Sequence, residues 1–162
     1  MQSENINFLT FTSSRPKAYA RIKGSSEYAD IAGTAYFFQS KKGVIVAIQV
    51  FGLPESKYKS MGRIFAVHIH SGSECRGDES DPFANAKMHY NPQNYLHPFH
   101  AGDMPPLFSC NGYAFSAFLT CRFGIEEIIG KTIIIHTNPD DFVTQPSGNS
   151  GTKIACGEIK RN

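Results

Sequence analysis

Short segments rich in β-branched and aromatic residues recur along the whole chain, separated by turn-forming residues. Apolar and polar residues alternate within them as in half-buried strands, and no segment shows the longer periodicity of an extended amphipathic helix. We therefore expect an all-β protein, an antiparallel sandwich or flattened barrel, with one helical turn over Ile125–Ile129. Eight strands are predicted, over Ala18–Lys23, Ile31–Gln39, Val44–Phe51, Arg63–His70, Leu107–Ser109, Tyr113–Phe123, Thr132–His136 and Lys153–Ile159.

Two long stretches interrupt this strand pattern. Residues 71–106 and 137–152 are rich in Gly, Pro, Asn and Asp and show almost no periodicity. A loop as long as the first is uncommon inside a compact domain unless it is functional. The first loop also contains His89, His97 and His100, which favours a functional interpretation.

The composition bounds the class of protein. A chain of 162 residues with 41% hydrophobic and 19% charged residues is typical of one folded domain, predicted over residues 15–162 after a flexible tail at 1–14. The net charge of +2, without a dense basic run, gives no reason to expect nucleic-acid or membrane-surface binding. No signal peptide is visible, so we expect a cytoplasmic protein unless a leader has been removed.

The four cysteines stand at Cys75, Cys110, Cys121 and Cys156. None of them forms a C-x-x-C pair, which excludes zinc-finger and thioredoxin interpretations. A long-range disulfide remains open, and the spacing alone does not assign its partners.

All six histidines lie between His68 and His136. His68 and His70 form an H-x-H on a strand, so both rings leave the same face and could hold one ion. By itself this pattern also fits two ordinary surface or edge histidines. His136 ends an apolar strand, where a single histidine is usually a hydrogen-bonded core or edge residue.

The loop holds a second set of ligand types. His97, His100 and Asp103 follow His89 within a segment fixed by Pro and Gly, and such a donor set suits a tetrahedral zinc. The alternative is a solvated loop that happens to be rich in histidine. Taken together, the strand and loop residues make seven candidate ligands without a thiolate, which favours copper(II) and zinc.

Six ordered segments then carry a resemblance to a known family. Over roughly residues 17–160, the sequence resembles the copper/zinc superoxide dismutase family. The matching segments are His68–His70, His89–Pro92, His97, His100–Pro105, Ile134–Asp141 and Gly151–Gly157.

The resemblance implies a Greek-key, immunoglobulin-like arrangement of the strands with two long functional loops. It also implies that Asp140 ties a copper ligand to a zinc ligand, although a turn-capping role is the alternative. A disulfide between Cys75 and Cys156 is implied as well, and Cys110 and Cys121 are then expected to be free thiols. The implied copper ligands are His68, His70, His89 and His136, and the implied zinc ligands are His89, His97, His100 and Asp103.

The implied activity is the conversion of superoxide to dioxygen and hydrogen peroxide. His89 would bridge the two metals, release copper when copper is reduced, and deliver a proton to peroxide. Lys153 stands where the family usually has Arg, and it would attract and dock the anion. Because Lys lacks the rigid donor fork of Arg, we expect retained but slower turnover. The alternative for Lys153 is a solvated strand residue.

Two departures from the family pattern leave other functions open. The segment from His97 to His100 is compact, and Phe142–Ser150 lacks the Lys/Glu-rich run that some relatives use to steer superoxide. A non-enzymatic metal-binding relative and a plain interaction module are the competing functions, which catalysis and metal content would distinguish. A homodimer and a monomer both remain open.

Overall fold

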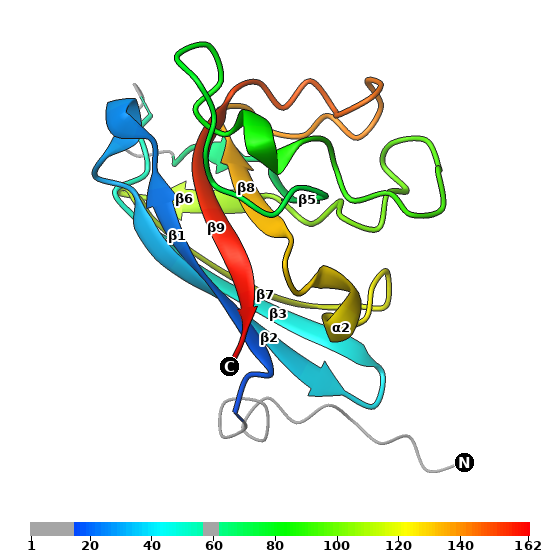
Figure 1. Cartoon of the computed structure of the whole chain (residues 1–162). Helices are drawn as coiled ribbons and strands as arrows, with labels where there is room; N and C mark the ends of the chain where they lie inside the picture. The colour runs from blue at the N-terminus through cyan, green and yellow to red at the C-terminus, as the bar shows by residue number, and fades with distance from the viewer. Residues whose placement is uncertain (1–14, 57–61) are drawn as a thin grey trace.

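The computed structural model describes residues 15–56 and 62–162 (Figure 1). The tail predicted over residues 1–14 lies outside the described residues. Within them, one antiparallel sheet of nine strands runs in the order β4-β6-β7-β3-β2-β1-β9-β8-β5, so the all-β prediction is confirmed. The strands are β1 Ala18–Gly24, β2 Ala32–Ser40, β3 Gly43–Phe51, β4 Ile64–Phe65, β5 Val67–His70, β6 Leu107–Cys110, β7 Tyr113–Thr120, β8 Thr132–His136 and β9 Lys153–Arg161.

Helical structure is short. The predicted helical turn is α2 Ile125–Ile128, and two single 3-10 turns are η1 Ser26–Tyr28 and η2 Ala84–Ala86. None of the helices in the described ranges is long and apolar enough to span a membrane.

The prediction of eight strands is wrong by one strand, because the segment predicted over Arg63–His70 is broken at Ala66. β4 pairs with β6, whereas β5 pairs with β8. Between them, the Ala66 N–H donates to Asn138 O at 2.8 Å, and Ala66 O accepts from the His136 N–H at 3.0 Å. Since β4 and β5 stand at opposite ends of the strand order but are neighbours in the chain, the sheet curls back on itself as a flattened barrel.

The Asn-Gly dipeptide makes the tight turn between β6 and β7. Asn111 and Gly112 have φ values of 49° and 74°, as a type I′ turn requires at both central positions. Cys110 and Tyr113 pair directly on either side.

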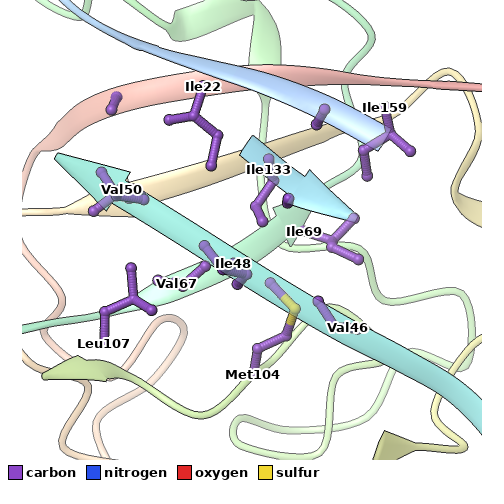
Figure 2. Packing of buried hydrophobic residues seen from close by; sticks show 14 of the residues in the cluster. Ile22, Val46, Ile48, Val50, Val67, Ile69, Met104, Leu107, Ile133 and Ile159 are labelled. Atoms are coloured by element: carbon purple, nitrogen blue, oxygen red, sulfur yellow. The ribbon is translucent and has the colours of Figure 1, made fainter. Parts of the chain in front are cut away.

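The core lies inside the barrel, where alternate residues of the strands meet. Val46, Ile48 and Val50 of β3 point inward and are fully buried. Figure 2 shows them facing Ile69 of β5 and Ile133 of β8 across the interior. This period of two sends the intervening residues of β5 and β8 to the outer face.

On that outer face, β5 and β8 are nevertheless buried along their whole length. The reason is that the two long loops, drawn green to yellow-green and orange in Figure 1, lie over this part of the sheet. A disulfide from Cys75 to Cys156 ties the first loop to β9, which confirms the predicted pair. The outer face of β5 and β8 is therefore a covered surface that polar side chains can occupy without contact with solvent.

Candidate metal centre

Two groups of ligand residues meet on this covered face. Within each group, one ligand atom from every residue lies within 4.8 Å of the others, and all seven residues are buried. The structure thus brings together every sequence-predicted ligand, and His89 belongs to both groups. The first group is His68, His70, His89 and His136, and the second is His89, His97, His100 and Asp103.

The strands position the first group. His68 and His70 leave the outer face of β5, and β8 brings His136 beside them. The Nε2 atoms of His70 and His136 lie 3.3 Å apart. The Nδ1 of His70 donates to Lys87 O at 2.7 Å, and the Nδ1 of His136 lies 3.3 Å from Gly151 O. Because each Nδ1 has its own backbone partner, the Nε2 lone pairs of both rings converge on one point.

The first loop reaches β5 closely enough to add its own ligands. Isolated bridges pair His70 with His89 and His68 with Asp103. A Cβ at Gly102 would lie only 2.2 Å from Ile69 O, so this approach requires glycine. The backbone contact between loop and strand therefore fixes where Asp103 stands.

His89 faces the two groups with its two ring nitrogens. Its Nδ1 lies 2.8 Å from Asp103 Oδ1 and 3.4 Å from His100 Nδ1. Its Nε2 is buried and has no hydrogen-bond partner. One imidazole is thus available to both sites at once.

Asp140 links the two groups by hydrogen bonds to one histidine of each. Its Oδ2 accepts from His68 Nε2 at 2.7 Å, and its Oδ1 accepts from His97 Nε2 at 2.8 Å. Oδ1 also accepts from the Phe142 N–H at 2.7 Å, so the carboxylate both orients the two rings and caps a turn. Burial alone would raise the pKa of Asp140, but hydrogen bonds from His68, Phe142 and His97 lower the pKa to about 2. The carboxylate is therefore ionised at neutral pH, and it fixes the outer nitrogens of both rings.

Three buried ring nitrogens show that the site fits metal ions. His68 Nδ1 and His89 Nε2 have no hydrogen-bond partner among the described residues, and His97 Nδ1 makes no well-aligned hydrogen bond although it lies 3.0 Å from Oδ2 of Asp103, another residue of its group. Such buried unpaired atoms are uncommon and cost about 1–3 kcal/mol each unless something else binds them. All three belong to ligand groups, and His68 and His97 turn their opposite nitrogens to Asp140.

The protonation state of the histidine rings also fits metal binding. Burial lowers the pKa of His68 to about 4, and burial lowers the pKa values of His70 and His136 well below their ordinary value. Neutral imidazole is the form that binds metal. Seven nitrogen and oxygen donors without a thiolate are a donor set for copper(II) and zinc.

Lys153 lies at the edge of the first group. It is the residue of β9 that pairs with His136 of β8. Its Nζ lies 2.6 Å from Asp81 Oδ2 and donates to Phe83 O at 3.1 Å, and its side chain is only 16% exposed. The alternative of a solvated strand residue is therefore wrong. Asp81 was not predicted from the sequence, because its contact is with a residue that is distant in the chain.

Two further residues hold the loop that carries the second group. The Gln145 side-chain amide pairs with both backbone groups of His97, accepting from its N–H at 3.0 Å and donating to its carbonyl at 2.7 Å. Arg122 donates to Pro98 O at 2.7 Å and to His100 O at 3.1 Å. Neither residue was predicted, since neither belongs to a ligand type or a spaced motif. Cys110 and Cys121 are free thiols, as predicted, and both are exposed.

Comparisons with known proteins agree with this geometry. The family model described as copper/zinc superoxide dismutase matches residues 31–159. "Superoxide dismutase [Cu-Zn] 2" of Aquifex aeolicus is 30% identical over 89% of this chain and 86% of its own length. "Superoxide dismutase [Cu-Zn]" of Legionella pneumophila is 31% identical over 79% of this chain and 77% of its own length. A crystal structure of a SOD-like protein from Bacillus subtilis, 26% identical, covers 86% of this chain and 96% of its own, with a TM-score of 0.69.

Proposed function

Because the chain belongs to the copper/zinc superoxide dismutase family, we propose that it is an oxidoreductase that dismutates superoxide. Two superoxide ions and two protons become one dioxygen and one hydrogen peroxide. The observation that carries the proposal is the pair of buried ligand groups that share His89, with all seven ligands in place. The substrate is thus a small inorganic anion that needs no large binding pocket.

The ligand groups assign a metal to each site. His68, His70, His89 and His136 would hold copper, and His89, His97, His100 and Asp103 would hold zinc. When bound, copper supplies one-electron redox chemistry, whereas zinc is redox-inactive and stabilises the loop.

His89 is proposed as the residue that supplies a proton. Its Nδ1 is fixed beside Asp103, while its Nε2 is buried and otherwise unpartnered. A proton held at Nε2 would lie on the side of the first ligand group, where peroxide must be protonated. Lys153 is proposed to attract and dock superoxide, because it pairs with His136 in the register of β8 and β9 and its positive charge is one of the causes that lower the pKa of His136.

The test is superoxide dismutation by the purified full chain after loading with copper and zinc, with both metals quantified on the same sample. We expect rapid, copper-dependent activity that His136→Ala abolishes and that Cys121→Ala, an exposed free thiol, leaves unchanged. Stoichiometric binding of both metals without activity would refute the enzyme and support the non-enzymatic metal-binding alternative.

We further propose a homodimer formed by one outer face of the barrel. Phe51, Phe108, Tyr113 and Phe115 lie exposed on β3, β6 and β7, and the rings of Phe51 and Tyr113 pack 5.0 Å apart. An aromatic surface of this kind favours association. Light scattering of the wild type and of Phe115→Glu tests it, and a monomeric wild type would refute it.

The domain limits of 15–162 and the cytoplasmic location stay predictions. A long-range disulfide such as Cys75–Cys156 is unusual in a reducing compartment. Cell fractionation with thiol trapping of the native protein tests both its location and its redox state.

A further inference from the structure

The ammonium of Lys153 is occupied by two partners that belong to the first long loop. Its Nζ lies 2.6 Å from Asp81 Oδ2 and 3.1 Å from Phe83 O. An ammonium has three N–H groups, so one donor remains for a third partner. The Lys153 side chain is largely buried, while that of Asp81 is 37% exposed.

The carboxylate of Asp81 is itself held in place. Its Oδ1 accepts from the Phe83 N–H at 3.0 Å, which leaves Oδ2 for Lys153. Phe83 packs with Ile134 of β8 and Cys156 of β9, and the disulfide joins Cys156 to the same loop. The pairing of Asp81 with Lys153 is therefore built into the packing.

This pair changes the charge that an incoming anion meets. Lys153 alone would present a full positive charge beside the first ligand group. With a carboxylate in direct contact, most of that charge is cancelled a few ångströms away, because the attraction from Nζ and the repulsion from Oδ2 act over similar distances. An Arg at this position would have five donors and could keep both loop contacts while still presenting a fork to an anion.

We propose that Asp81 is a specificity-determining residue that limits how strongly the first site binds small monovalent anions, superoxide among them. It acts by neutralising Lys153 and does not touch the metal ligands. The proposal rests on the proposed function only for the identity of superoxide as the natural anion. Asp81 thus lowers the affinity of the first site for anions, while its contacts with Lys153 and Phe83 hold the loop in place.

The experiment compares three forms of the copper- and zinc-loaded full chain: wild type, Asp81→Asn and Glu79→Gln. Glu79 is exposed on the same loop, so its substitution removes an equal charge without touching Lys153. Azide serves as the anion probe, and its dissociation constant is measured from the absorption change of bound copper. The same samples give kcat/KM for superoxide over a range of ionic strengths.

We expect Asp81→Asn to bind azide about three- to tenfold more tightly, because the substitution removes the negative charge that is in direct contact with the Lys153 ammonium. At low ionic strength, its kcat/KM for superoxide should be higher than that of the wild type. Its kcat/KM should also decrease more steeply as salt is added, because salt screens the Lys153 charge that Asp81 no longer neutralises. Glu79→Gln should change azide affinity less than twofold. Azide affinity that is unchanged in Asp81→Asn, weaker, or equal to that of Glu79→Gln would overturn the proposal.

A second substitution guards against misfolding. Asn has a single side-chain acceptor for the two donors that Asp81 now serves, whereas Asp81→Ser keeps a hydroxyl that can cap the Phe83 N–H. If Asp81→Asn does not fold, Asp81→Ser must show the same gain in azide affinity, and its absence there refutes the inference. If Asp81→Asn binds azide more tightly but neither the wild type nor any variant dismutates superoxide, the proposed function is refuted and the role of Asp81 in anion binding is supported.

Discussion

Loss of the Cys75–Cys156 disulfide should destabilise the metal-free protein by about 4–5 kcal/mol. The two cysteines are separated by 81 positions, so the bridge closes about half of the 162-residue chain into one loop. The chain-entropy relation gives about 3 kcal/mol for a 15-residue loop and about 4.7 kcal/mol for 100 residues, which places this loop at about 4.5 kcal/mol. Cys156 is also almost fully buried, so its replacement by Ala removes some packing as well.

Urea unfolding of metal-free Cys75→Ala/Cys156→Ala, followed by circular dichroism at neutral pH, measures this loss. With a slope of about 2 kcal/mol per molar urea, the midpoint should fall by about 2 M. The matched control is Cys110→Ala/Cys121→Ala, which also removes two cysteines but takes them from exposed, unbridged positions. Its free energy of unfolding should stay within about 0.5 kcal/mol of the wild type for each substitution.

The slope of the transition is an independent check on the reasoning. If the bridge acts by restricting the unfolded chain, the variant should unfold to a more expanded ensemble and its slope should rise. A loss below about 1 kcal/mol with an unchanged slope would refute the entropic argument.

Three further perturbations address the site. Asp140→Asn leaves one acceptor oxygen for the donors of His68 and His97, so zinc affinity in a chelator competition should fall by about 10–100-fold. Gln145→Ala removes both contacts with the His97 backbone and should weaken zinc binding in the same assay, whereas Gln39→Ala, at an exposed position of β2, should not. The lowered pKa of His68, about 4 instead of 6.5, means that the unfolded chain binds the extra proton between these values. The free energy of unfolding of the metal-free protein, measured by urea denaturation, should therefore fall as the pH drops from about 6.5 to 4, by up to about 1.4 kcal/mol per pH unit for each such histidine.

The strands and the two candidate ligand groups were predictable because their signals are local or ordered along the chain. Alternation marks each strand, and the Asn111-Gly112 turn fixes a hairpin by itself. The ligands could be assigned from the resemblance, since their order and spacing are distinctive. The break at Ala66 could not be predicted, because the segment is strand-like throughout and only its two different partners, β6 and β8, divide it.

The contacts around the ligands lie beyond sequence reasoning for a different reason. Asp81 is 72 positions from Lys153, and Gln145 is 48 positions from His97. Each contact uses an ordinary polar side chain whose partner is either another ordinary side chain or a backbone group, so no residue type or spacing marks it. Only the folded arrangement of the two loops on the sheet reveals these contacts.

These contacts also explain why a loop with almost no regular structure can hold a precise site. The first loop is tied to β9 by the disulfide and by Lys153, to the second loop by Gln145, and to the end of β7 by Arg122. Because these links come from different elements and use backbone groups or other side chains, they hold the loop in place without the ring nitrogens of the candidate ligands. The buried, unpartnered nitrogens of the ligand histidines can then be retained, since the surrounding links supply the stability that those nitrogens cost. Asp81 belongs to the same set of links, because its carboxylate contacts the Lys153 ammonium and accepts from the Phe83 N–H.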